Sequence, residues 1–335
     1  MKKLFSSLFI ILFFPINVFA FQDSARSTVV MDIDSGRIFY KKNANDERLI
    51  ASITKIMTAI VTIENGHLNS KVTVGREILD MYGTNIYVEV GEKIKIKDLL
   101  YGLILRSGND ASVVLSKKIS GNENRFVKLM NLKADKIGMK NTYFNNPHGL
   151  DEKTKNYSTA YDMALLSRYA YKNKIYREIT LRKSYRTSTG KKTYLWYNKN
   201  KLLNTYKYCT GGKNGYTPNA GKTLVTTASK NNLNITIVSL NDPNSYGNHK
   251  TMYEYFFRKY KKYQLISKKT FKIDKNFYNG DVYIKKSFYY PLSNEEKRNI
   301  RTVVYINKYS PDKSIGEIKI YLYKKEIGNL NIYKK

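Results

Sequence analysis

The segment from residue 51 to residue 63, Ala-Ser-Ile-Thr-Lys-Ile-Met-Thr-Ala-Ile-Val-Thr-Ile, constrains the fold more than any other stretch of this chain. Its apolar residues recur at Ile56, Ile60 and Ile63, and this spacing predicts a helix. Ser52 and Lys55 would then lie one turn apart on one helix face. A serine hydroxyl is a weak nucleophile without a neighbouring base, and a lysine amine can be that base if its pKa is lowered. Alone, the pattern is more typical of a helix cap followed by a solvated lysine.

The first 20 residues have the pattern of a cleaved secretory signal peptide. Lys2 and Lys3 precede an apolar run over residues 4–14, and Val18-Phe19-Ala20 forms a small-residue exit site. The apolar run is too short for a comfortable membrane span. We therefore expect residues 1–20 to be removed on export, and the mature protein to act outside the cytoplasm, at the cell wall or the outer face of the membrane.

A chain of 335 residues can hold one large domain and a smaller one. Near the N-terminus, two β-rich runs flank residues 34–36, Asp-Ser-Gly, which is typical of a hairpin. Beyond the basic run at residues 258–262 the chain reads as strands, with apolar and polar residues alternating over residues 316–322. We predict a first domain over residues 21–262 and a β-rich domain over residues 263–335. No amphipathic membrane helix follows the last predicted strand, which puts membrane attachment in doubt.

The formal net charge of +32 is unusually high for a chain of this length. Such a charge could attract nucleic acid, a membrane surface or an anionic wall polymer, although a solvated lysine-rich surface explains it equally well. Export argues against nucleic acid. Cys209 is the single cysteine, so no internal disulfide can form, and ordinary packing is favoured over a nucleophilic role.

Three other polar positions have simple structural explanations. His148 could titrate or bind a metal, but beside a proline and a glycine it is more typical of a loop hydrogen-bonder. The chain has only three histidines without paired spacing, which predicts no metal site. Residues 159–162, Thr-Ala-Tyr-Asp, predict a capping box that opens a helix running to about residue 172, with Asp162 as part of the cap.

Two further short motifs contain residues suited to catalysis. Residues 106–111, Arg-Ser-Gly-Asn-Asp-Ala, follow a predicted short helix, and Gly108 would let Ser107 and Asn109 project from a loop. A plain helix–loop–helix joint is the simpler explanation. Farther along, Lys213 lies between glycines, before two strand-like segments. These glycines would let a ligand approach the backbone closely, and an ordinary turn is the alternative.

Together, the three motifs are more specific than any one of them. Serine-x-x-lysine, serine-x-asparagine and lysine-x-glycine occur in this order, and with residues 147–151 and 157–164 they resemble the low-molecular-weight penicillin-binding proteins. These are the secreted serine-type D-alanyl-D-alanine carboxypeptidases. The resemblance spans about residues 25–260, and a weaker likeness continues through the tail. It implies an α/β (α+β) fold: a β-lactamase/transpeptidase-like domain with a central antiparallel sheet flanked by helices, plus a small C-terminal β domain.

The resemblance also implies a reaction. The enzyme would remove the terminal D-Ala from peptidoglycan stem peptides through an acyl-enzyme on Ser52, and β-lactam antibiotics would inhibit it. Lys55 would be the general base, Ser107 would pass a proton to the leaving amine, and no metal or cofactor is implied. The backbone N–H groups of Ser52 and Tyr216 would form the oxyanion hole. The substrate-binding residues would be Asn109, Lys213, Asn214, Gly215, Tyr216 and Thr217.

Two departures from the family pattern and two rival functions stand beside this interpretation. Position 214 is asparagine where the family usually has threonine, which predicts altered affinity more than lost chemistry, because an amide can still donate a hydrogen bond. The arginine that often assists carboxylate binding has no clear match in residues 241–250, where His249 and Lys250 are the nearest cations. A β-lactamase would share the fold, but its usual Glu-x-x-Leu-Asn loop is absent. A non-catalytic wall-binding protein of the same fold is the other alternative.

Overall fold

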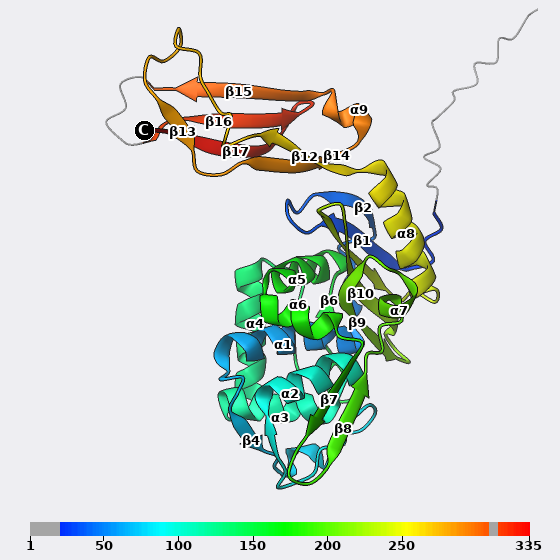
Figure 1. The fold of residues 1–335 in the computed structure, drawn as a ribbon. Coiled ribbons are helices and arrows are strands. Elements are labelled where there is room, and N and C mark those ends of the chain that lie inside the picture. The colour runs from blue at the N-terminus through cyan, green and yellow to red at the C-terminus, as the bar shows by residue number, and fades with distance from the viewer. Residues whose placement is uncertain (1–20, 308–313) are drawn as a thin grey trace, which may run out of the picture.

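The computed structural model describes residues 21–307 and 314–335, so the expected signal peptide, residues 1–20, lies outside the described residues. Its centre is a five-stranded sheet in the order β2-β1-β11-β10-β9, antiparallel throughout (Figure 1). The predicted hairpin forms β1 and β2, with Gly36 in the turn at φ +78°. The strands are β1 (Ser27–Asp32), β2 (Ile38–Lys42), β9 (Cys209–Thr217), β10 (Gly221–Lys230) and β11 (Leu233–Leu240).

Both faces of the inner strands β1, β10 and β11 are largely buried, and apolar and threonine side chains fill most of their positions. Val29 and Met31 on one face belong to the core that contains the helix of the Ser52 segment. Val30, on the opposite face, packs in a second core with Met252 and Phe256 of the last long helix. The predicted sheet flanked by helices is therefore confirmed. Strand β9 forms one edge of the sheet, so one side of its backbone does not pair with another strand of the sheet.

The helices of this part of the chain include those predicted from the spacing of Ile56, Ile60 and Ile63, before residue 106 and from residue 159 to about residue 172. They are α1 (Lys55–Asn65), α2 (Ile96–Tyr101), α3 (Asn109–Ser120), α4 (Glu123–Ile137), α5 (Ala160–Lys172), α6 (Lys174–Leu181), α7 (Leu202–Thr205) and α8 (Ser245–Lys259). Short helical turns are η1 (Ala51–Thr54), η2 (Arg76–Ile78) and η3 (Gly102–Arg106). Three two-stranded pairs complete the domain: β3 (Arg48–Leu49) with β6 (Tyr157–Ser158), β4 (Lys71–Thr73) with β5 (Lys93–Lys95), and β7 (Ser184–Ser188) with β8 (Thr193–Tyr197).

The predicted capping box at the start of α5 is only half present. The Thr159 hydroxyl accepts from the backbone N–H of Asp162 at 3.0 Å, as an N-cap should. The Asp162 carboxylate does not return to the cap. It accepts instead from the backbone N–H of Asn141 at 2.7 Å and from the Thr142 hydroxyl at 2.8 Å. The prediction that the Asp162 side chain belongs to the cap is therefore wrong, because its carboxylate is occupied by Asn141 and Thr142.

The C-terminal part forms separate sheets above the central one (Figure 1). Strand β12 starts at Lys261 and pairs with β14 from its first residue, so the predicted boundary after residue 262 falls inside β12. A partly buried ion pair between Arg37 and Glu296 connects this part to the β1–β2 hairpin. Its elements are β12 (Lys261–Ile266), β13 (Val282–Ile284), β14 (Phe288–Leu292), α9 (Asn294–Lys297), β15 (Ile300–Ile306), β16 (Ser314–Leu322) and β17 (Lys325–Lys334). Over the described residues, no helix combines the length and apolarity that crossing a bilayer requires.

Candidate active site

The nucleophile candidate lies at a strained corner that precedes α1. Ser52 is in the 3₁₀ turn η1, and α1 begins only at Lys55. Ala51, immediately before it, has φ +48°, which is rare for a residue with a side chain and is often found at functional sites. Two glycines allow this corner to be packed tightly. A Cβ on Gly149 would come within 2.0 Å of the Ala51 carbonyl oxygen, and one on Gly215 within 2.8 Å of the Ser52 backbone nitrogen. The absence of a side chain at Gly215 therefore lets the Ser52 backbone approach strand β9 closely.

Lys55 is completely buried beside Ser52. Its Nζ lies 3.0 Å from Ser52 Oγ, 2.8 Å from Asn109 Oδ1 and 2.6 Å from the backbone oxygen of His148. The Asn109 and His148 oxygens accept hydrogen bonds from this amine. A neutral amine can donate to both of them and still direct its lone pair at the serine hydroxyl.

The surroundings of Lys55 favour its neutral form. Burial lowers the pKa of Lys55 well below its usual value, and the positive charge of Lys213 lowers it further, while Asp110 acts in the opposite direction. Burial and the charge of Lys199 bring the pKa of Lys213 to about 7. Because the two amines disfavour each other's charge, the cluster can hold one lysine neutral as a base and the other charged.

The second motif forms a sharp corner opposite Lys55. Helix α2 widens into the π-helical turn η3, and Ser107 follows with φ +72°, in the left-handed region. Gly108 itself has φ −61°, so the prediction that Gly108 makes the turn is wrong: the serine takes the unusual conformation. Asn109 does not project from a loop either, because it is the first residue of α3 and is 3% exposed.

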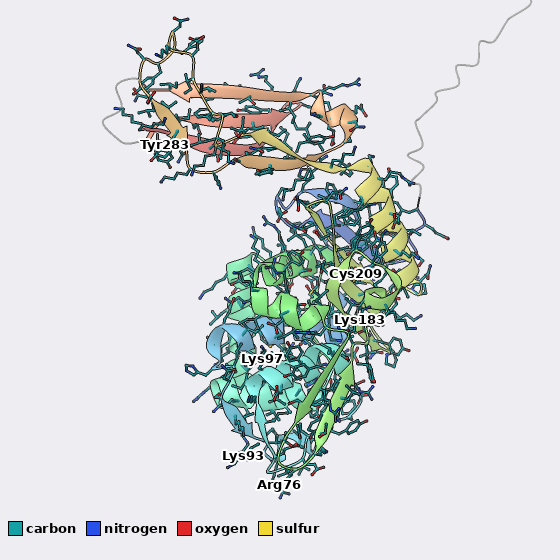
Figure 2. The ribbon with its side chains drawn as sticks, in the orientation of Figure 1. Arg76, Lys93, Lys97, Lys183, Cys209 and Tyr283 are labelled. Carbon is teal, nitrogen blue, oxygen red and sulfur yellow. The ribbon has the colours of Figure 1, made fainter. Side chains whose placement is uncertain are left out.

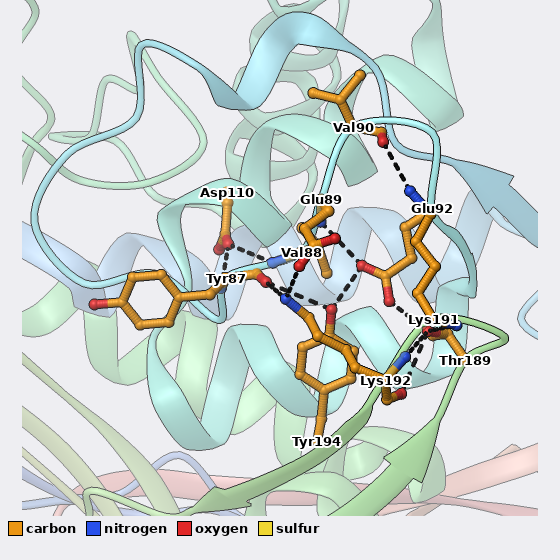
Figure 3. A network of polar contacts seen from close by, with 10 residues as sticks. All are labelled: Tyr87, Val88, Glu89, Val90, Glu92, Asp110, Thr189, Lys191, Lys192 and Tyr194. Atoms are coloured by element: carbon orange, nitrogen blue, oxygen red, sulfur yellow. Dashed lines mark hydrogen bonds and ion pairs between the residues drawn. The ribbon is translucent and has the colours of Figure 1, made fainter.

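Asp110, the residue after Asn109, holds in place the segment around Tyr87 that forms a wall of the site. The Asp110 carboxylate accepts from the backbone N–H of Tyr87 at 2.7 Å, and Figure 3 shows that the same segment is also bound from the other side. There Tyr194 donates to Glu92 at 2.6 Å, and Lys192 donates to the Tyr87 carbonyl at 2.7 Å. The segment is thus held between α3 and the β7–β8 hairpin.

The third motif lies on the edge strand β9. Lys213 is 1% exposed, and its Nζ donates to the Asn214 carbonyl oxygen at 2.7 Å. Asn214 is half-buried and Tyr216 is exposed, on the alternate face of the strand. Thr217 is buried, and its hydroxyl donates to Asp151 at 2.6 Å. The structure therefore brings Ser52, Lys55, Asn109, Lys213 and Gly215 to one site, with the Thr217 hydroxyl turned away into a structural contact.

Lys199 is a residue of this site that the sequence pattern missed. Its backbone N–H donates to Leu105 in η3 at 3.1 Å, and its Nζ donates to the Thr84 hydroxyl at 3.2 Å. The Thr84 carbonyl in turn accepts from the backbone N–H of Asn109 at 2.8 Å. Lys199 is therefore built into the second motif and lowers the pKa of both Lys55 and Lys213. No spacing rule could reveal it, because the contact with Thr84 joins residues 115 positions apart.

The two histidines considered as site residues are structural. His148 accepts from the backbone N–H of Leu150 at its Nδ1, and burial lowers its pKa to about 3, so the loop hydrogen-bonding role is confirmed. His249 is fully buried between Thr226 and Ser239, and burial lowers its pKa to about 3 as well. A neutral, enclosed imidazole cannot hold a substrate carboxylate by charge.

Cys209 is at the start of β9, packed in the core beneath α8 (Figure 2). Burial raises the pKa of its thiol to about 11, so the thiol is protonated at neutral pH and the predicted packing role is confirmed. Within residues 21–307 and 314–335, no three His, Cys, Asp or Glu side chains are grouped so as to hold a metal ion.

Known proteins are similar to this chain in sequence. A family model described as D-alanyl-D-alanine carboxypeptidase matches residues 17–244. The D-alanyl-D-alanine carboxypeptidase DacF of Bacillus subtilis is 38% identical over 252 residues, which cover 70% of this chain and 64% of that protein. DacA of Haemophilus influenzae is 33% identical over 235 residues, which cover 65% of this chain and 57% of that protein. The matches thus span about three fifths of these curated relatives.

Solved structures extend the likeness to the C-terminal sheets. Penicillin binding protein 5 from Haemophilus influenzae superposes with a TM-score of 0.78 at 26% identity, covering 95% of this chain and 98% of that one. A D-alanyl-D-alanine carboxypeptidase from Mycobacterium tuberculosis superposes with a TM-score of 0.69 at 29% identity, covering 73% of this chain and 95% of that one. The fold predicted from the three motifs is confirmed, and the chain belongs to the D-alanyl-D-alanine carboxypeptidase family.

Proposed function

We propose that this protein is a serine-type D-Ala-D-Ala carboxypeptidase that trims the terminal D-Ala from peptidoglycan stem peptides. The observation that carries the proposal is the fully buried Lys55, whose Nζ lies 3.0 Å from Ser52 Oγ in surroundings that keep it neutral. This is the geometry of an activated nucleophile and its base. Family membership gives the reaction class, and the site contains the groups that the reaction requires.

The first half-reaction transfers the peptide to Ser52. Lys55 takes the proton of the hydroxyl as Ser52 Oγ attacks the penultimate D-Ala carbonyl carbon. The C–O bond forms, the C–N bond to the terminal D-Ala breaks, and the proton returns to the leaving amine through Ser107. Water then hydrolyses the ester and frees the shortened peptide. β-Lactams would acylate the same hydroxyl and stop at this stage.

The substrate would lie along the edge of β9. The close approach of Gly215 to the Ser52 backbone nitrogen supports an oxyanion hole formed by the N–H groups of Ser52 and Tyr216. Asn109 donates one Nδ2 proton to the Tyr82 carbonyl at 2.7 Å, which leaves the other for a peptide carbonyl. Lys213 would supply the positive charge for the terminal carboxylate.

Asn214 and Thr217 have different parts in this proposal. Asn214 replaces the usual threonine, so its amide would donate the hydrogen bond that the hydroxyl otherwise makes to the carboxylate. The Thr217 hydroxyl is held by Asp151 and accepts from the backbone N–H of Ala220 at 3.1 Å. Thr217 would therefore act by fixing the end of β9, with only its backbone available to substrate.

The same proposal covers the division of the chain into domains and the location of the mature enzyme. Residues 1–20 would be a secretory signal peptide, residues 21–262 the catalytic domain and residues 263–335 an accessory β domain. The mature enzyme would act outside the cytoplasm, where the charge of +30 that remains of the chain's +32 without Lys2 and Lys3 favours contact with an anionic wall polymer or the membrane surface.

The experiment is the release of free D-Ala from diacetylated Lys-D-Ala-D-Ala by the purified protein. We expect turnover by the wild type and none by Ser52→Ala. A folded wild type that releases no D-Ala would contradict the proposal. Rapid catalytic hydrolysis of nitrocefin, in place of slow stoichiometric acylation, would favour a β-lactamase.

A further inference from the structure

The loop at residues 148–152 runs from the candidate base to the end of strand β9. At one end of the loop, the His148 backbone oxygen accepts from Lys55 Nζ at 2.6 Å. Near the other end, Asp151 accepts from the Thr217 hydroxyl at 2.6 Å, and Thr217 is the last residue of β9. The loop therefore borders the site on the side toward which β9 runs.

Glu152, the last residue of this loop, connects it to a second segment of the site. Tyr82 belongs to that segment, and its carbonyl oxygen accepts from Asn109 Nδ2 at 2.7 Å. Partial burial and a hydrogen bond to the Glu152 carboxylate raise the pKa of the Tyr82 hydroxyl, and the charge of Asp151 acts in the same direction. Tyr82 and Glu152 are both exposed, so a bound peptide could reach the Glu152 carboxylate from solvent.

The charges of the site are separated along β9. Lys213 lies four residues before the end of the strand, and the cation Lys199 is close enough to lower its pKa. Glu152 lies beside the end of the strand, where its partner Tyr82 is a neutral hydroxyl that leaves the negative charge in place. Among the described residues, Glu152 forms no ion pair. The site is thus suited to a ligand with a negative group at one end and a positive group farther along.

A bound stem peptide would present its groups in this order. If Lys213 holds the terminal carboxylate and Ser52 attacks beside Gly215, the acyl part continues toward the end of β9. Extended residues are about 3.4 Å apart, so the residue that precedes D-Ala-D-Ala lies opposite the last residue of the strand. An amine on a flexible four-carbon stem at that position would reach the adjoining loop, where the carboxylate open to solvent is that of Glu152.

We propose that Glu152 binds a free side-chain amine on the residue that precedes D-Ala-D-Ala. The enzyme would thereby favour stem peptides with an unmodified diamino acid at that position over peptides whose amine is already acylated, because acylation removes the positive charge. This inference rests on the proposed function, since Lys213 and Ser52 set the direction of the peptide. The contact would be charge-assisted and sensitive to salt.

The test compares Nα-acetyl-Lys-D-Ala-D-Ala, whose side-chain amine is free, with the Nα,Nε-diacetylated peptide. We expect the wild type to favour the free amine in kcat/KM by roughly two- to fivefold at low salt, the range of an exposed ion pair, and by less at high salt. The difference should lie in KM, because the contact exists both before acyl transfer and during it. Glu152→Gln should use the two peptides equally well, and Glu152→Lys should favour the diacetylated one.

The matched control is Glu326→Gln, which removes an exposed carboxylate on β17 and should keep the wild-type preference. Equal kcat/KM for the two peptides in the wild type would overturn the role of Glu152. So would Glu152 variants that keep the wild-type ratio, including variants that slow both peptides equally, because such a loss would mean that Glu152 only holds the loop in place. A folded wild type that hydrolyses neither peptide would overturn the proposed function itself.

Discussion

Replacing Lys55 by arginine tests the role of the neutral amine in this site. A guanidinium stays protonated in proteins, so Lys55→Arg keeps a positive charge and loses the base. The change is informative because the surroundings of Lys55, fully buried and beside Lys213, disfavour the charged form of the wild-type amine. The variant would place a permanent charge where the wild type has a neutral group 3.0 Å from Ser52 Oγ.

The expected loss is large. A positioned general base contributes about 10²–10⁴-fold to a rate. At about 1.4 kcal/mol per tenfold, this corresponds to an increase of about 3–5 kcal/mol in the activation free energy of acylation. The larger side chain also strains a fully packed position, which costs typically about 1–3 kcal/mol of stability. Lys55→Met, of similar length and without charge, therefore serves as a second variant that also lacks the base.

The assay is the second-order rate constant for acylation by a fluorescent penicillin, with thermal unfolding measured in parallel. Lys250→Arg, an exposed position, is the control for the substitution itself and should match the wild type. We expect both Lys55 variants to fold and to acylate at least about 100-fold more slowly. A folded Lys55 variant that acylates within tenfold of the wild type would show that another group is the base.

Three further predictions concern other parts of the site. Asn214→Thr should raise kcat/KM for diacetylated Lys-D-Ala-D-Ala by about tenfold or less, because the amide already keeps part of a hydrogen bond worth roughly 1.5–3 kcal/mol; an unchanged or lower value would contradict this. Gly149→Ala should slow penicillin acylation and lower Tm, because its Cβ would collide with the Ala51 carbonyl oxygen at a backbone with φ +88°; wild-type values of both would refute the packing argument. Lys199→Gln removes a positive charge that lowers the pKa of Lys213, which is about 7 in the wild type. The pH at which the acylation rate falls on the alkaline side, as Lys213 loses its proton, should therefore rise, and an unchanged pH would count against this coupling.

The parts of the site that the sequence predicts are those governed by local spacing. Ser52 and Lys55 are three residues apart, and one helical turn brings them together without help from distant segments. Strands β10 and β11 are likewise readable, because valine, isoleucine and threonine, which favour strands, are frequent in both of them. The order of the three motifs then identifies the family and, through it, the fold.

The parts that the sequence does not predict depend on long-range contacts. The left-handed backbone at Ser107 could not be read from a motif in which Gly108 is the obvious place for a turn. Asp162 looks like a cap residue until a segment 20 residues earlier binds its carboxylate. Lys199 contributes through charge and a tertiary contact to Thr84, and neither is encoded in spacing.

The central claim is that Ser52 is the residue that becomes acylated. The most direct measurement is mass spectrometry of a proteolytic digest after the purified protein has reacted with benzylpenicillin. The account predicts one stoichiometric penicilloyl adduct, located on Ser52, and no adduct in Ser52→Ala. A well-folded wild type without an adduct, or an adduct on a different residue such as Ser107, would contradict it.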